Sequence, residues 1–322
     1  MKTEVLILSS LYDFSTDLVC LRLQEASIPF LRLNKEKLKE YRISLDPLKP
    51  ELTVKTGKKT YVIDNTLNAV WFRQPVFLRN TPEKALSPEE QLERSQWTAF
   101  IRSLSLFKAA NWMNFPQNTY LAESKPYQLA MAKQSGFHVP QTIATNDAYQ
   151  IKQFFPNDVV LKSLDTVLIH ENDNCLFTYT DIGESNAVND DNVSGTPLLA
   201  QKVLSNKKDI RITVIGNKLF AVEILANSEG IEGDWRVIPK NELDYIDIDL
   251  DQDTAKSCFK LTKTLGLNFA AIDLIVNPDG IYFIEVNPTG EWGWLTTKDR
   301  AIDYEIASWL SSSRKLSARE AS

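Results

Sequence analysis

The sequence predicts a mixed α/β (α+β) protein with more than one lobe, and three observations lead to this prediction. The chain has 322 residues, of which 43% are apolar and 24% charged, so it is long enough to bury the cores of two or three lobes. Its N-terminus alternates apolar strand patterns with a helical pattern. Near its C-terminus, two apolar strand patterns flank a turn, and each contains a single carboxylate.

The N-terminal lobe is expected to begin with a strand, a helix and a second strand. Residues 4–9 and 29–33 have the apolar runs typical of strands, and residues 13–26 are expected to form the helix between them. Further strands are expected at residues 51–54, 60–63 and 69–73. The turn Thr56-Gly57-Lys58-Lys59 lacks the spacing of a phosphate-binding loop.

A long helix and a crossover are expected to follow. Ser87-Pro88-Glu89-Glu90 is a capping box with proline at the first helical position, which predicts a helix to about residue 110. Residues 111–116 are interpreted as a crossover, and Ser124-Lys125-Pro126 starts a helix that stops at Gly136. The predicted organisation is an N-terminal lobe of residues 1–115, a central lobe of 116–200, a C-terminal lobe of 201–311 and a disordered polar tail of 312–322.

The second half of the chain alternates strands and helices. Strands are expected at 158–162, 167–170, 175–179 and 198–204 and from residue 209, and helices at 254–265 and 301–310. Four aspartates between residues 247 and 253 suggest a calcium loop, but the twelve-residue frame lacks its glycine and its final glutamate. They are instead interpreted as a strand edge and the acidic start of a helix that Gly266 ends.

Composition excludes several classes of protein. The net charge of −6 argues against broad nucleic-acid binding. No long apolar run predicts a membrane span, and no signal-peptide pattern opens the chain. Cys20, Cys175 and Cys258 are scattered and odd in number, which indicates free thiols in a reducing cytoplasm. His138 and His170 are too few and too far apart to suggest a catalytic triad or a zinc site.

The C-terminal hairpin contains the strongest candidate for a functional site. Residues 269–276 and 281–286 are expected to pair across the turn Asn277-Pro278-Asp279-Gly280. Asp273 and Glu285 are the charged residues of these two strands, and burying them without a partner would cost several kcal/mol. Asn287 lies on the same strand face as Glu285, and a register that brings Asp273 opposite them forms a cluster of oxygen ligands. Such a cluster suits Mg²⁺ that bridges nucleotide phosphates, whereas an ordinary hairpin with acids at its rim is the alternative.

The hairpin also resembles a known family. Asp273 on the first strand, together with Ile284-Glu285-Val286-Asn287 at the end of the second, is similar to the metal-binding end of ATP-grasp ligases. The segment from Asn287 to Leu295, NPTGEWGWL, more narrowly resembles the microviridin-type (graspetide) peptide maturases. The resemblance covers residues 4–311, including the run from Lys125 to Thr142, which is similar to the entry to the ATP-grasp central lobe. It departs from many ATP-grasp enzymes between residues 162 and 201, where no glycine-rich flap occurs.

The resemblance implies a role for each part of an ATP site. Lys125 and Lys162 would hold phosphates, the main chain of residues 201–204 would pair with adenine, and Asp209 would bond the ribose. The four residues of this hinge are Gln201, Lys202, Val203 and Leu204. Arg211 and Arg236 would steady the phosphoryl group that moves, although an arginine or lysine at any of these positions also suits a structural role.

The resemblance further implies a substrate and partners. The substrate would be a ribosomal precursor peptide whose Asp or Glu side chains are joined to Ser or Thr hydroxyls or to Lys. Its leader would dock on the enzyme, which would be a cytoplasmic homodimer. Arg73, at the end of a strand, would face the cleft, or it is a solvated strand-end residue.

One acidic segment is a candidate for leader contact. Residues 163–200 contain no Lys or Arg, so they either stay solvated or attract a cationic partner. Asp190 and Asp191 precede the hinge strand and are the first candidates. Two rival functions remain: an ATP-grasp ligase that acts on a small amine or extends a protein tail, and a nucleotide-binding module without turnover.

Overall fold

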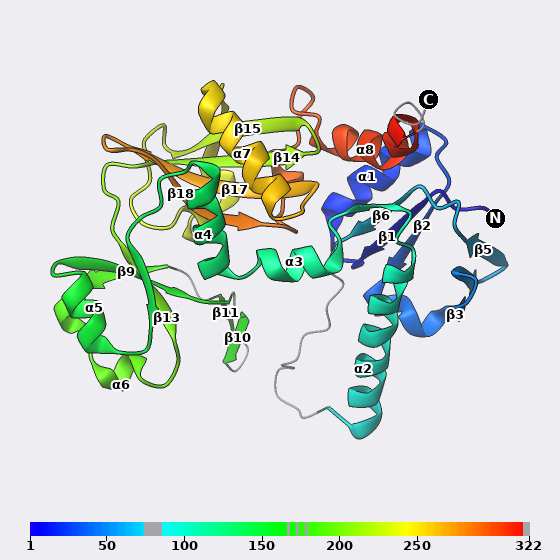
Figure 1. The fold of residues 1–322 in the computed structure, drawn as a ribbon, viewed down its shortest axis with the longest axis horizontal. Helices are drawn as coiled ribbons and strands as arrows, with labels where there is room; N and C mark the ends of the chain where they lie inside the picture. The colour runs from blue at the N-terminus through cyan, green and yellow to red at the C-terminus, as the bar shows by residue number, and fades with distance from the viewer. Residues whose placement is uncertain (74–85, 166–167, 172–173, 178–179, 318–322) are drawn as a thin grey trace. The chain divides into compact units, whose positions relative to one another are not determined.

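The computed structural model describes residues 1–73, 86–165, 168–171, 174–177 and 180–317. The chain forms two compact units (Figure 1). Unit 1 comprises residues 1–119, 266–269 and 289–322, and unit 2 comprises residues 120–265 and 270–288. The predicted boundaries of the three lobes stay a prediction.

Unit 1 contains a parallel four-stranded sheet in the order β2-β1-β6-β7. Its strands are β1 (Val5–Ser9), β2 (Phe30–Asn34), β6 (Ala69–Phe72) and β7 (Asn111–Met113). Helix α1 (Phe14–Glu25) connects β1 to β2, and Asp13 caps it by accepting from the Thr16 N–H. Helix α8 (Ile302–Ser317) packs beside α1 and buries Ile302, Ile306 and Leu310 (Figure 1).

A second hydrophobic layer of unit 1 covers Leu6, Leu8, Val70 and Phe72 of this sheet. It includes Ile101 and Leu104 from the end of α2 (Pro88–Ser103) and the short helix η2 (Leu104–Leu106). It also includes residues of η1 (Lys35–Glu40) and of the antiparallel strands β3 (Arg42–Asp46), β4 (Glu51–Thr56) and β5 (Lys59–Ile63). The N-terminal part therefore has the α/β core that its strand and helix patterns predict.

Three predictions for unit 1 differ from the structure. The helix expected to reach residue 110 ends at Ser103, where the chain tightens into η2. The expected crossover at 111–116 contains β7, which pairs with β6. The last helix, expected to end at residue 310, continues to Ser317, and residues 318–322 of the predicted tail lie outside the described residues.

Unit 2 contains two antiparallel arrangements of strands. The first sheet has the order β12-β9-β13-β8, and the second has the order β16-β15-β14-β17-β18. The first is built from β8 (Thr142–Thr145), β9 (Asp158–Ser163), β12 (Asp181–Glu184) and β13 (Leu198–Lys202). The second is built from β14 (Lys208–Ile215), β15 (Lys218–Ala226), β16 (Leu243–Asp247), β17 (Phe269–Asn277) and β18 (Gly280–Asn287). Strands β10 (Leu168–Glu171) and β11 (Asn174–Phe177) form a separate hairpin.

Helices α4 (Lys125–Ser135) and α7 (Gln252–Thr264) pack on each other, α4 against β18 and α7 against β14 (Figure 1). Asp251 caps α7, and Asp253 lies in its first turn. The aspartate-rich segment of residues 247–253 therefore leads into a helix, as predicted. The remaining short helices are α3 (Pro116–Ala122), α5 (Ala148–Phe154), η3 (Ser185–Ala187), α6 (Asp190–Val193), η4 (Trp235–Val237), η5 (Lys240–Glu242) and η6 (Gly293–Leu295). Within the described ranges, every helix is too short or too polar to cross a bilayer.

Candidate active site

The hairpin of β17 and β18 brings the predicted oxygen ligands together. Asp273 pairs in register with Glu285, and Ala271 pairs with Asn287. The Nδ2 of Asn287 donates to Oε1 of Glu285 over 3.0 Å. A bulge after Asp273 shifts the register of the rest of the hairpin. The predicted register, with Asp273 opposite Glu285, is therefore confirmed.

Two arginines neutralise this pair of carboxylates. Nη1 of Arg211, on β14, donates to Oδ1 of Asp273 over 2.8 Å. Nη2 of Arg236, in η4, donates to Oδ2 of Asp273 and to Oε1 of Glu285, each over 2.5 Å. Asp273 is only 5% exposed, so these charge-assisted contacts offset the cost of its burial.

The electrostatic balance differs between the two carboxylates. Burial alone would raise the pKa of Glu285, but the charges of Arg236 and Lys162 outweigh it and lower this pKa to about 2. For Asp273, burial is the larger effect and raises the pKa against the two arginines. Burial also lowers the pKa of Lys162, although Glu285 opposes this. Glu285 is therefore ionised at neutral pH.

Both predicted phosphate lysines lie in unit 2 and contact strand β9 or its neighbour. Nζ of Lys162, on β9, donates to the side-chain oxygen of Gln201 on β13 over 3.1 Å. Nζ of Lys125, at the first turn of α4, donates to the carbonyl oxygen of Ser163 over 2.9 Å. The sheet pairing of β9 with β13 thus places Lys162 beside the start of the predicted hinge.

A pocket in unit 2 unites the predicted nucleotide residues. Its lining includes the whole predicted hinge together with one of the two phosphate lysines, the ribose aspartate and one of the two arginines: Lys162, Gln201, Lys202, Val203, Leu204, Asp209 and Arg236. Lys125 and Arg211 are not among the residues that line it. Val160, Ile275 and Ile284 add apolar surface to the same pocket. Apolar side chains next to the main chain at a strand end provide what a purine ring needs.

Comparison with known proteins extends this result. A family model described as the RimK-like ATP-grasp domain matches residues 186–310, which include the hinge and the hairpin. The protein has the ATP-grasp fold. The Chryseobacterium gregarium RiPP-associated ATP-grasp ligase, solved with ADP and a leader and core peptide, matches with 26% identity and a TM-score of 0.82 over 96% of each chain.

Two solved macrocyclase structures are also similar. The macrocyclase MdnC of Microcystis aeruginosa MRC, bound with precursor peptide MdnA, matches with 25% identity and a TM-score of 0.81, over 96% of this chain and 99% of that chain. The macrocyclase MdnB of the same organism shares 22% identity and a TM-score of 0.75 over 96% and 99% of the two chains, which supports the fold. A search of the curated proteins found no relative of this chain.

Several residues of this ATP-grasp pocket were missed by sequence reasoning. Lys207 lines the pocket and forms a buried ion pair with Asp209, the predicted ribose ligand. Asp234 lines it too, and accepts from both the main-chain N–H and Nη1 of Arg236, over 3.0 and 3.1 Å. Nothing in the spacing of Lys207 signals this role, whereas Asp234 stands two residues before a predicted arginine.

A buried glutamine fixes the end of strand β18 between Glu285 and Asn287. Gln128, on α4, is 3% exposed. Its Nε2 donates to the Val286 carbonyl oxygen over 2.8 Å, and its Oε1 accepts from the Val286 N–H over 3.1 Å. This reciprocal pair holds the main chain at Val286. Strand alternation places the side chains of residues 285 and 287 on the face opposite to the Val286 side chain. The sequence offers no local signal for this contact, since it joins segments that are 158 residues apart.

The oxygen ligands in the ATP-grasp hairpin fit the Mg²⁺ that this fold implies. Asp273, Glu285 and Asn287 offer two carboxylates and an amide, the ligand types that hard divalent cations take. An arginine nitrogen already lies against both carboxylates, which shows that this position accepts positive charge. Among the residues that the structure describes, no cluster of three or more His, Cys, Asp or Glu side chains offers another such site.

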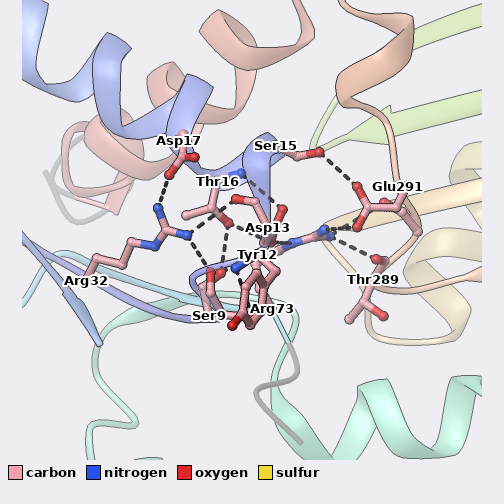
Figure 2. Close-up of polar contacts among 12 residues, drawn as sticks. Ser9, Tyr12, Asp13, Ser15, Thr16, Asp17, Arg32, Arg73, Thr289 and Glu291 are labelled. Carbon is pink, nitrogen blue, oxygen red and sulfur yellow. Dashed lines mark hydrogen bonds and ion pairs between the residues drawn. The ribbon is translucent and has the colours of Figure 1, made fainter. Parts of the chain in front are cut away.

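Arg73 lies in unit 1, within the network shown in Figure 2. Its Nε donates to half-buried Asp13 over 2.9 Å, its Nη1 to the Thr289 carbonyl oxygen over 2.9 Å, and its Nη2 to Glu291 over 3.1 Å. Its side chain is 4% exposed, so it is not a solvated strand-end residue. Figure 2 shows Ser15 donating to the other oxygen of Glu291, over 2.8 Å. These contacts hold the segment that follows the hairpin, and Arg73 as a substrate residue stays a prediction.

The two acidic candidates for leader contact lie on the surface of unit 2. Asp190 and Asp191 are exposed residues in the first turn of α6, which Asn189 caps. They are not among the residues that line the ATP-grasp pocket. The leader contact predicted for them would therefore lie outside this pocket.

Proposed function

We propose that this protein is an ATP-dependent ligase that matures a ribosomal precursor peptide. It activates Asp or Glu side chains of the peptide as acyl phosphates and closes ω-ester or ω-amide macrocycles with Ser, Thr or Lys. The observation that carries this proposal is the single pocket that combines Lys162, the hinge and Arg236, with Arg236 bonded to the carboxylate pair. The similar ligase and the macrocyclase MdnC, both solved with peptides, support the class of substrate.

The chemistry has two displacements. A peptide carboxylate oxygen attacks the γ-phosphorus of ATP, the bond to the β,γ-bridging oxygen breaks, and ADP leaves. A hydroxyl or amine then attacks the acyl carbon, the bond from this carbon to the phosphate oxygen breaks, and the nucleophile loses its proton. The oxygen lost from the carboxylate leaves in phosphate, so each ring corresponds to the loss of one water from the peptide.

The residues of the site have distinct roles in this scheme. Lys125 and Lys162 hold phosphate oxygens, and Arg211 and Arg236 stabilise the negative charge of the acyl phosphate and of the oxyanion that follows it. Gln201, Lys202, Val203 and Leu204 position adenine, and Asp209 positions the ribose. Asp273, Glu285 and Asn287 would hold Mg²⁺, which neutralises and orients phosphate oxygens.

Recognition of the leader is proposed to occur away from the residues that carry out this chemistry. A macrocyclase must retain one long peptide while several side chains visit its site, so a separate docking surface is useful. The exposed Asp190 and Asp191 are proposed to contact a basic residue of the leader. Arg73 is proposed as a further substrate contact. The protein is also proposed to be a cytoplasmic homodimer, and light scattering of the purified chain tests the dimeric state.

Mass spectrometry tests the proposed function directly. Purified protein, ATP, Mg²⁺ and the precursor should yield a peptide lighter by one water per ring, together with ADP. A ligase that extends a protein tail would instead make its acceptor heavier. Release of AMP and pyrophosphate would indicate adenylation and would contradict the acyl-phosphate mechanism.

A further inference from the structure

Two of the three residues assigned to the metal, Asp273 and Glu285, share one cation, the guanidinium of Arg236. Its Nη2 donates to Oδ2 of Asp273 and to Oε1 of Glu285, each over 2.5 Å. Asn287 donates to the same Oε1 over 3.0 Å. A single nitrogen of one arginine therefore lies against the oxygens that a divalent cation would need.

The two arginines of the site differ in how firmly they are held. Arg211 is 5% exposed and donates to Oδ1 of Asp273, the oxygen that does not accept from Arg236. The side chain of Arg236 is 31% exposed. Its Nη1 donates to Asp234, so one end of the guanidinium has an anchor outside the carboxylate pair. Arg236 can lose the two contacts of Nη2 and remain paired with Asp234.

We propose that Arg236 is an exchangeable counter-cation of the metal site, which withdraws from Asp273 and Glu285 before their oxygens ligate a divalent cation. This inference rests on the proposed function in assigning that pair to the metal. Asp273 is buried and Glu285 beside it is half-buried, so their ionised forms repel each other and are stabilised by a nearby positive charge. A guanidinium and a divalent cation that use the same oxygens exclude each other, because their charges repel and the ligand positions overlap.

The exchange gives an order to the events in the site. While Nη2 of Arg236 bonds the carboxylates, this nitrogen is not available to the acyl phosphate. Once the metal is loaded, the same guanidinium, still paired with Asp234, is released to bind phosphoryl oxygens. Arg236 thereby couples metal loading to readiness for phosphoryl transfer.

Binding of Mn²⁺ to the protein without ATP or peptide tests this inference. Electron paramagnetic resonance should show that Arg236→Ala binds Mn²⁺ more tightly than the wild type, by about tenfold or more. Arg236→Lys should lie between them, since lysine keeps a positive charge but not the forked geometry. Lys240→Ala removes an exposed positive charge nearby in the sequence and should match the wild type. Equal or weaker binding by Arg236→Ala would overturn the proposal.

Thermal unfolding provides a second readout if the alanine variant folds poorly. Without metal, Arg236→Ala should melt below the wild type, because three carboxylates, those of Asp234, Asp273 and Glu285, lose a partner. Mn²⁺ should raise the Tm of Arg236→Ala, or of Arg236→Lys, by more than it raises the Tm of the wild type. An equal rise in all three proteins would overturn the proposal. Neither measurement uses ATP or peptide, so failure of the exchange is distinguishable from failure to close rings.

Discussion

Replacing Glu285 by glutamine should destabilise the protein in a manner that depends on pH. The change keeps the shape of the side chain but removes the charge that Arg236 and Lys162 stabilise. The pKa of Glu285 falls from an ordinary 4.5 to about 2 in the folded protein. A difference of this size corresponds to a contribution of about 3 kcal/mol to the free energy of unfolding at pH 7.

The direction of the pH effect follows from the lowered pKa. A carboxyl group with a lowered pKa in the folded state stabilises it above its ordinary pKa, and loses this contribution as the pH falls through the folded value. The advantage of the wild type over Glu285→Gln should therefore fall from about 3 kcal/mol at pH 7 to about 2 kcal/mol at pH 3.5 and approach zero near pH 2.

Urea unfolding followed by far-UV circular dichroism measures this difference. Glu223→Gln is the matched control, since Glu223 pairs with Lys208, whose side chain is 60% exposed. This control should change the free energy of unfolding by less than about 1 kcal/mol. If Glu285→Gln were as stable as the wild type at pH 7, or differed from it equally at every pH, the electrostatic account of the cluster would be wrong.

Three further predictions concern turnover, recognition and packing. Arg236→Ala should keep its affinity for metal-free ATP near that of the wild type and lower kcat by about 10²- to 10³-fold, because a donor to the developing charge is lost; normal turnover would make this arginine structural. Replacing both Asp190 and Asp191 by lysine should raise KM for the full-length precursor at low salt and leave ATP binding unchanged. Equal KM values for the wild type and this variant would show that the segment is solvated and does not contact the leader. Gly293→Ala should destabilise by about 1–3 kcal/mol in thermal unfolding, because its Cβ would lie 2.5 Å from Ser15 Oγ and 2.6 Å from the Phe14 ring. Gly183→Ala, where a Cβ has open space, should not destabilise the protein. Equal Tm values for Gly293→Ala and Gly183→Ala would contradict this packing argument.

The carboxylate pair was predictable because it depends on short-range rules. Strand alternation places Glu285 and Asn287 on one face, and the turn of residues 277–280 limits the register with Asp273. The bulge after Asp273 was not predictable, since no glycine or proline marks it. Local rules therefore give the partners in this hairpin but not its irregularity.

Contacts between distant segments account for the rest of what sequence reasoning missed. The contact of Lys162 with Gln201 requires that β9 pairs with β13, and the clamp of Gln128 on Val286 requires that α4 packs on β18. Strand β7 has three residues, and its pairing with β6 defines it more than its own pattern does. Such features arise from the fold as a whole, so the local pattern of a single sequence does not reveal them.

The division of the chain into units determines when each is complete during synthesis. Every residue of unit 2 has been made once the ribosome passes Pro288, whereas unit 1 still lacks residues 289–322. Until α8 emerges, the face of α1 against which it packs has no cover, and Asn68 lacks the Leu310 carbonyl oxygen to which its side chain donates. Unit 1 thus starts before unit 2 and is completed after it, so a nascent chain that stalls between Pro288 and Leu310 would leave unit 1 open after every residue that lines the pocket of unit 2 has been made.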